Sequence, residues 1–166
     1  MNPLPVYLID TSYLLELFAV PGNSTEKAVA EVRKRISDAA RNRARLYVAV
    51  PSIYQLASHI SDVANGNLRV SLAEKVRDSV LSSLDEGMPW TVLPSREARW
   101  LRDAVTRFAD THVREGIDLT DGTLIDEALR LKQTTYRGPA WRVHIWTKDR
   151  KLKAREPDSE PDAFLG

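Results

Sequence analysis

Four short, largely apolar runs rich in β-branched and aromatic residues divide the chain, at 6–9, 46–50, 90–93 and 142–146. The first two runs contain no alternation of apolar and polar positions. Continuous runs of this length are typical of strands that are buried on both faces of a parallel sheet. The pattern therefore predicts four strands, of which the first two are expected to be buried on both faces.

Helical periodicity occupies the segments between these runs. In the segment 24–43, for example, Ala28, Val32 and Ile36 recur four residues apart and would form one apolar face. Further helices are expected over 13–18, 52–60, 71–84, 95–108 and 122–132. Because strand and helix candidates alternate along the chain, we predict an α/β fold with three layers, α/β/α, around a central parallel sheet.

Composition narrows the class of protein. The chain has 166 residues, of which 43% are hydrophobic, a net charge of +1 and no cysteine. These values suit one globular domain, expected over 1–156, and exclude disulfides and thiol chemistry. The proline-containing acidic stretch 157–166 is expected to form a flexible tail. With no signal-peptide pattern and no apolar run of membrane-spanning length, we expect a cytoplasmic protein with no membrane contact.

Three aspartates are expected at the edge of the sheet that is formed by the carboxyl ends of its parallel strands. Asp10 ends the first strand, Asp121 opens a helix, and Asp149 lies just past the fourth strand. Taken singly, Asp10 and Asp121 could be helix N-caps and Asp149 a turn residue. However, the strand ends of a parallel sheet open onto one crevice. Carboxylates gathered there repel each other unless a cation compensates, and oxygen ligands favour Mg²⁺ or Mn²⁺.

The segments around these aspartates resemble the motifs of PIN-domain nucleases. The stretch 9–18 (IDTSYLLELF) resembles the opening of that family, and 50–57 (VPSIYQLA) resembles its second motif. The stretches 119–125 (LTDGTLI) and 145–149 (IWTKD) resemble the third and fourth. The resemblance implies a parallel sheet flanked by helices and metal-dependent cleavage of RNA. Many members of the family are toxins of bacterial toxin–antitoxin pairs, so a cognate antitoxin is an expected partner.

The resemblance assigns roles by position. Asp10, Asp121 and Asp149 match the metal-binding acids of the family, and Ser12 and Thr147 match small hydroxyl positions that assist the site. Catalysis would then be hydrolysis of a phosphodiester bond, with the aspartates as ligands rather than nucleophiles. Asp10 as a phosphotransfer nucleophile of another α/β fold is disfavoured, because no second aspartate follows two residues later.

The second motif departs from the family pattern. Gln55 stands where a glutamate is usual, and an amide oxygen can reach a metal but brings no charge. Asp118, three residues before Asp121, could contribute instead, or could be a solvated loop acid. The alternative to a nuclease is therefore a PIN-like module, with an incomplete site, that binds RNA or a protein without cutting. The apolar helix faces leave a homodimer open.

Two groups of basic residues could hold a substrate strand. One lies along the predicted helix 24–43 and the residues after it, where a solvated face is the simpler interpretation. The other is Lys148, Arg150 and Lys151, beside Asp149. The tryptophans Trp90, Trp100, Trp141 and Trp146 could stack on bases, although packing in or around the core is the more common role.

Overall fold

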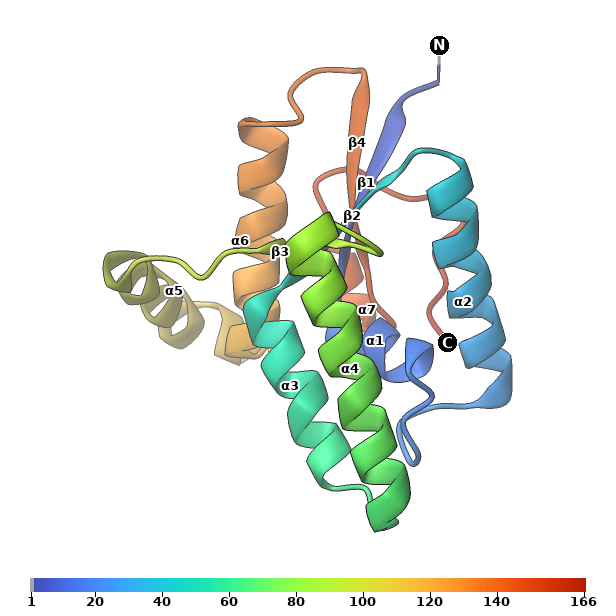
Figure 1. Ribbon diagram of the computed structural model, residues 1–166. Coiled ribbons are helices and arrows are strands. Elements are labelled where there is room, and N and C mark those ends of the chain that lie inside the picture. Colours follow the sequence, from blue (N-terminus) through green and yellow to red (C-terminus); the bar gives the residue numbers. More distant parts are fainter. Residues whose placement is uncertain (1) are drawn as a thin grey trace.

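The computed structural model describes residues 2–166 and has a four-stranded sheet at its centre (Figure 1). The strands are β1 (Leu4–Ile9), β2 (Arg45–Ala49), β3 (Thr91–Leu93) and β4 (Trp141–Trp146). They lie in the order β3-β2-β1-β4, and every pair is parallel. The predicted α/β fold with a central parallel sheet is thus confirmed.

Helices cover both faces of the sheet. They are α1 (Thr11–Leu17), α2 (Glu26–Arg41), α3 (Val50–Ser61), α4 (Gly66–Glu86), α5 (Ala98–Asp110), α6 (Leu119–Gln133) and α7 (Arg150–Lys153), with a 3₁₀ turn η1 (His112–Glu115). These are all the helices of residues 2–166. None of them is long and apolar enough to cross a membrane.

The alternation of side chains along the strands divides the core into two parts. In β1, Ile9 packs with apolar residues of α1–α4, whereas Val6 and Leu8 pack with α6 and Leu152 of α7. A strand with apolar residues on both faces must be covered on both sides, which explains the continuous apolar runs in the sequence.

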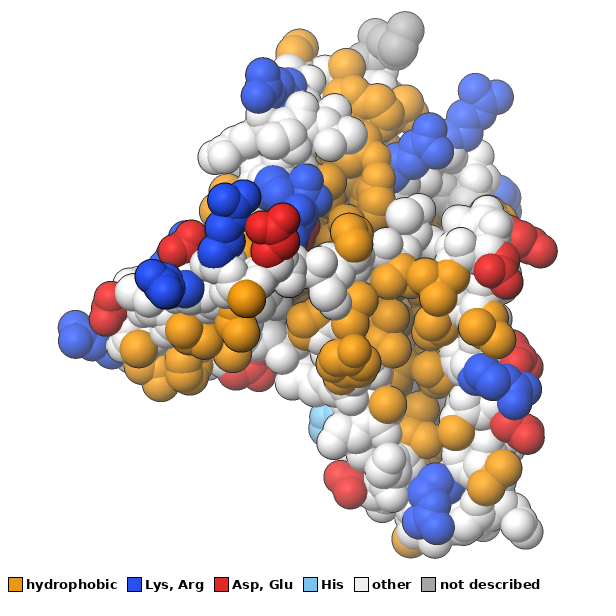
Figure 2. Space-filling model, turned by 60° about the vertical axis from the view of Figure 1, so that its left-hand side comes forward, with side chains coloured by type: hydrophobic (Ala, Val, Ile, Leu, Met, Phe, Trp, Pro, Cys, Tyr) orange, Lys and Arg blue, Asp and Glu red, His pale blue; other side chains and the backbone are white. Residues whose placement is uncertain are grey.

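Helix α5 departs from this layered arrangement. It projects from the body (Figure 1), and only Ala104 along its length is buried. Leu101 and Val105 are 52% and 41% exposed, and apolar side chains are visible on this projecting part of the surface (Figure 2). The amphipathic pattern of the segment predicted a helix correctly, although most of its apolar face is not covered by the core.

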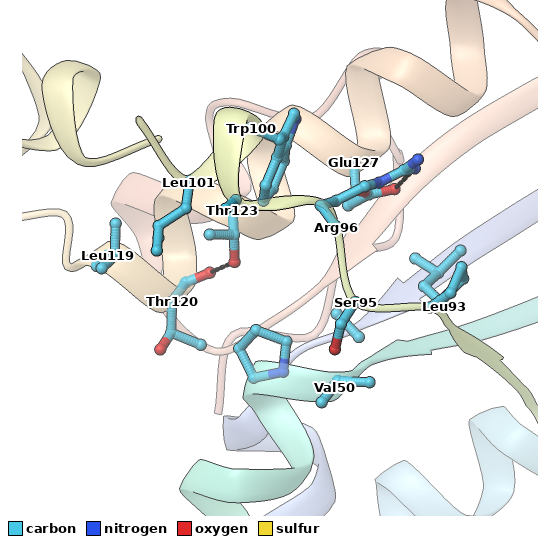
Figure 3. A pocket seen from close by; sticks show the side chains of 14 residues that line it. Val50, Leu93, Ser95, Arg96, Trp100, Leu101, Leu119, Thr120, Thr123 and Glu127 are labelled. Carbon is cyan, nitrogen blue, oxygen red and sulfur yellow. Dashed lines mark hydrogen bonds and ion pairs between the residues drawn. The ribbon is translucent and has the colours of Figure 1, made fainter. Parts of the chain in front are cut away.

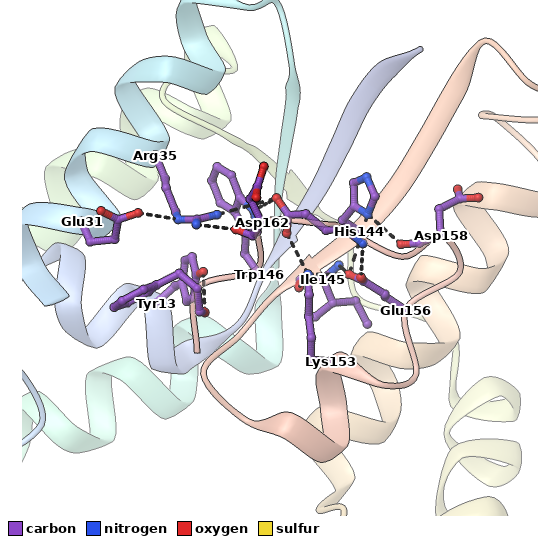
Figure 4. Close-up of polar contacts among 12 residues, drawn as sticks. Tyr13, Glu31, Arg35, His144, Ile145, Trp146, Lys153, Glu156, Asp158 and Asp162 are labelled. Carbon is purple, nitrogen blue, oxygen red and sulfur yellow. Dashed lines mark hydrogen bonds and ion pairs between the residues drawn. The ribbon is translucent and has the colours of Figure 1, made fainter. Parts of the chain in front are cut away.

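The segment 157–166, expected to be a flexible tail, packs along the edge of β4 (Figure 4). Asp158 accepts a hydrogen bond from the Val143 N–H at 2.8 Å, and its own N–H donates to the Val143 carbonyl. The Tyr13 hydroxyl donates to the Phe164 carbonyl at 3.0 Å. These contacts join the end of the chain to both β4 and α1.

Candidate active site

Asp10 and the residues after β4 lie side by side because β1 and β4 are neighbours. Ile9 pairs with Trp146 in the sheet, and the Asp10 N–H continues the ladder by donating to the Trp146 carbonyl at 2.9 Å. Both strands end here at their carboxyl ends. The residues that follow these strands, Asp10 and Thr147, therefore lie at the same edge of the sheet.

Two hydroxyls hold the Asp10 carboxylate. Thr147 Oγ1 donates to Asp10 Oδ2 at 2.8 Å, and Ser12 Oγ donates to the same oxygen at 2.9 Å. The backbone N–H of Lys148 in turn donates to Ser12 Oγ at 2.9 Å. Asp10 is only 5% exposed, and burial raises its pKa although these hydrogen bonds act in the opposite direction. The sequence-predicted residues Ser12 and Thr147 thus both contact Asp10.

Asp121 belongs to the first turn of α6, and its carboxylate accepts no hydrogen bond from residues 2–166. Burial, and then repulsion from Asp10, Asp118 and Asp149, raises the pKa of Asp121 to about 7. Repulsion of this kind requires Asp10, Asp118 and Asp149 each to lie near Asp121. The structure therefore brings the three predicted aspartates, and Asp118, to one place.

Three of the four carboxylates also cap helices. Asp10 caps α1, Asp118 accepts from the Asp121 N–H at 2.8 Å, and Asp149 accepts from the Lys151 N–H at 2.7 Å. The N-cap interpretation considered for Asp10 therefore holds, and it holds for Asp149 in place of a turn. A cap hydrogen bond engages one carboxylate oxygen and does not prevent the other from binding a cation.

No cation among residues 2–166 forms an ion pair with these four carboxylates. Within residues 2–166, none of them forms a salt bridge, and the nearest lysine in sequence, Lys148, pairs with Glu16 instead. In the same part of the chain, no group of three or more acidic or histidine side chains is arranged so that it could already hold a metal ion. The carboxylates are thus close enough to repel one another but do not form a ready coordination shell.

The donor set nevertheless fits a hard divalent cation in its chemistry. All four side chains offer oxygen, and their mutual repulsion would be relieved by positive charge. Two further hydroxyl oxygens, Thr11 Oγ1 and Ser52 Oγ, are buried at the starts of α1 and α3 with no hydrogen-bond partner in residues 2–166. Buried hydroxyls without a partner are unusual and are commonly satisfied by water or an ion.

The remaining predicted site residues, which are Gln55, Lys148, Arg150 and Lys151, differ in their burial and in their partners. Gln55 is half-buried in α3 and makes no hydrogen bond with the carboxylates. Lys148 Nζ is engaged by the fully buried Glu16, which the sequence had not connected with it. Arg150 and Lys151 are exposed and form no salt bridge within residues 2–166. A Cβ added to Gly116 would lie 2.7 Å from Lys151 Nζ, which places this lysine beside the loop that leads to Asp118.

A pocket of about 430 Å³ lies against the first turn of α6, the turn that also carries Asp121 (Figure 3). It opens between the ends of β2 and β3 and is walled by α5 and the first turns of α3 and α6. At its rim, Arg96 binds Glu127 through two hydrogen bonds of 2.6 and 2.9 Å. Sequence reasoning assigned no role to these two residues, because nothing local connects positions that are 31 residues apart.

Comparison with known proteins adds no family assignment. No protein-family model matches this chain, and no curated protein matches it.

Proposed function

We propose that this chain is a metal-dependent ribonuclease of the PIN type, which hydrolyses phosphodiester bonds in RNA. The observation that supports this proposal best is the convergence of Asp10, Asp118, Asp121 and Asp149 at the carboxyl edge of a parallel sheet, with no salt bridge to any of them within residues 2–166. Such a group of carboxylates is costly without a cation, and open α/β sheets bind their ligands at this edge.

Each side chain has a role in this proposal. Asp10, Asp121 and Asp149 would hold Mg²⁺ or Mn²⁺, with Asp118 or Gln55 as a further oxygen donor. A divalent ion held there supplies Lewis-acid chemistry and lowers the pKa of a bound water. Ser12 and Thr147 orient the Asp10 carboxylate through the hydrogen bonds described above.

The substrate strand would be held by the free cations beside Asp149. Arg150 and Lys151 are available for phosphate contacts, whereas Lys148 is engaged by Glu16 and is better described as a positioning residue. The same proposal includes a role as the toxin of a toxin–antitoxin pair, with an antitoxin protein as the partner.

A second candidate function is a PIN-like module that binds RNA without cutting it. Gln55 favours this alternative, because it replaces a carboxylate by a neutral amide. The lack of a ready coordination shell among residues 2–166 points in the same direction. The two candidates share the fold and differ in whether the acidic cluster binds a metal.

Cleavage of single-stranded RNA by the purified protein, with Mn²⁺ or with a chelator, tests the proposal. We expect cleavage only with the metal ion, and a loss of at least about 100-fold in Asp10→Asn, because removing one member of a catalytic group costs several kcal/mol. Asp85→Asn serves as the matched control, since Asp85 is exposed near the end of α4, the helix that leads into the opposite end of the sheet.

Three outcomes separate the candidates. Metal-dependent cleavage that Asp10→Asn retains would overturn the assignment of the site. RNA binding with no cleavage, and no stabilisation by Mn²⁺, would favour the binding module. Cleavage that is present only in Gln55→Glu would identify a site that has lost activity through this one substitution.

A further inference from the structure

The pocket beside the acidic cluster has walls that are almost wholly apolar. Val50 and Pro51 line it from α3, Leu93 from the end of β3, and Trp100 and Leu101 from α5 (Figure 3). Its volume of about 430 Å³ falls in the range of small-ligand sites. A cavity of this kind takes a flat or compact apolar group rather than a charged one.

The pocket and the acidic cluster share one wall, the first turn of α6. Leu119, Thr120 and Thr123 face the pocket, whereas Asp121, between them, belongs to the cluster. Thr123 Oγ1 donates to the Thr120 carbonyl at 2.7 Å, within this part of the helix. Whatever group occupies the pocket therefore lies next to whatever occupies the cluster.

Trp100 differs from the other tryptophans of the chain. Trp90 packs against Phe18, Trp141 against Tyr136, and Trp146 against Tyr7 and Tyr13. Trp100 has no aromatic neighbour of this kind in residues 2–166, is only partly buried, and lies on the pocket wall. Its indole ring is therefore the one that can stack on a ligand.

Polar groups are few and are placed around this apolar space. The guanidinium of Arg96 is paired with Glu127, which is 4% exposed and is also bound by Arg130 at 2.9 Å. Ser95 and Thr120 line the pocket with hydroxyls that make no hydrogen bond within residues 2–166. A hydroxyl both donates and accepts, so each can pair with either kind of polar group on a ring edge.

We propose that this pocket binds one nucleobase of a single-stranded RNA whose backbone crosses the acidic cluster. A nucleobase combines a flat apolar face, for Trp100, with a polar edge, for Ser95 and Thr120. Stacking on an aromatic side chain is the usual way in which proteins hold unpaired bases. The inference rests on the proposed function for the identity of the strand, and it adds a base-binding subsite to that function.

The proposal is tested by measuring the affinity of the protein for two labelled RNA strands by fluorescence anisotropy. The strands have equal length, but one carries its bases and the other is abasic at every position. A chelator is present, so that neither strand is cut. Both strands have the same phosphates, so the ratio of their affinities isolates the contribution of the bases. We expect the wild type to favour the base-bearing strand by roughly fivefold or more, the lower end of what stacking of one base contributes.

Substitutions test which residue causes the preference for the base-bearing strand. Trp100→Ala should remove most of the ratio and Trp100→Phe should retain it, because a phenyl ring still stacks. Tyr54→Ala is the matched control, since Tyr54 is a 71% exposed aromatic residue that does not line the pocket. A wild-type ratio near one would overturn the proposal, and so would an unchanged ratio in Trp100→Ala. A free mononucleotide such as AMP or UMP that binds as tightly as the strand would overturn the assignment to RNA.

This test is separate from the test of cleavage. If the base preference is absent while Asp10→Asn abolishes metal-dependent cleavage, the nuclease proposal stands and the subsite is wrong. If the preference is present and depends on Trp100 while no cleavage occurs, the pocket is a base-binding site in a protein that does not cut.

Discussion

The four carboxylates at the sheet edge differ in what compensates their negative charge. As helix caps, Asp10, Asp118 and Asp149 use one oxygen each to satisfy backbone N–H groups, and the positive ends of the helices favour their charge. Asp121 caps nothing, and its carboxylate has no hydrogen-bond donor within residues 2–166. This side chain therefore experiences the repulsion of the other three with the least compensation.

The stability of the metal-free protein should depend on the protonation of Asp121. Its pKa is raised from 3.8 to about 7 in the folded protein, so the folded state binds more protons than the unfolded state between these values. The free energy of unfolding therefore falls as the pH rises from about 4 to about 7 and is level above that range. Asp121→Asn should make this slope shallower but not remove it, because the raised pKa of Asp10 also contributes to it. The substitution should stabilise the metal-free protein at pH 8 by on the order of 2 kcal/mol, because the partial exposure of Asp121 to water weakens the effect.

Urea denaturation with chelator at a series of pH values measures this effect. Mn²⁺ added to the wild type should produce a similar gain at pH 8, whereas Asp121→Asn should respond to the metal ion less. The exposed carboxylate of Asp85 provides the control substitution, Asp85→Asn, which should leave the pH slope in place. A wild-type protein whose stability is independent of pH between 4 and 7 would contradict the described crowding of the carboxylates.

Individual residues of the site differ in how far the sequence predicts them. Asp10 follows the first apolar strand directly and Asp149 comes three residues after the last residue of the fourth, so the chain pattern alone puts both at one edge of a parallel sheet. The engagement of Lys148 by Glu16 could not be predicted, because the two residues are 132 positions apart and each looks like a surface charge. The pocket around Trp100 was missed because the amphipathic pattern of α5 is equally typical of a helix packed on the core.

At the scale of elements, the acidic segment after α7 takes the place of a further strand. β4 is the edge strand of the sheet, so its outer N–H groups have no strand partner. The side chains of Glu156 and Asp158 accept hydrogen bonds from the Ile145 and Val143 N–H groups at 2.9 and 2.8 Å. The composition of the segment 157–166 indicated a flexible tail. The hydrogen bonds between carboxylates and the backbone of β4 could not be predicted, because they leave no pattern of apolar residues in the sequence.

Glu156→Ala should therefore destabilise the fold by about 2 kcal/mol, the typical cost of leaving a buried donor without its partner. The substitution leaves the Ile145 N–H unpaired and removes one ion-pair partner, at 2.7 Å, of Lys153. Guanidinium denaturation measures the loss. Ser159→Ala, an exposed change in the same segment, should stay within about 0.5 kcal/mol of the wild type. Equal stability of all three proteins would show that the segment contributes nothing to the sheet.

The whole molecule has a net charge of only +1, so any attraction for RNA must come from local groups of cations. Part of the basic face of α2 is engaged in the structure, whereas Lys27 and Lys34 are exposed and form no salt bridge within residues 2–166. Arg35 binds Glu31 at 3.0 Å and the Asp162 carbonyl at 2.5 Å, and Arg41 binds Asp38 at 2.5 Å. Arg150 and Lys151 also have no such partners within residues 2–166, and they lie beside Asp149, so the proposed site favours them over α2 as the place where a strand would bind.

The salt dependence of RNA binding distinguishes these two surfaces. Each phosphate contact on a single strand contributes about −0.7 to the slope of log K against log salt concentration. The double substitution Arg150→Ala/Lys151→Ala should therefore weaken binding and make the slope shallower by about 1.4. Lys27→Ala/Lys34→Ala removes the same charge from two exposed positions of α2 and should change neither quantity. If the α2 substitutions instead produced the shallower slope, the strand would lie along α2, and neither the acidic cluster nor the pocket of Trp100 could be its binding site.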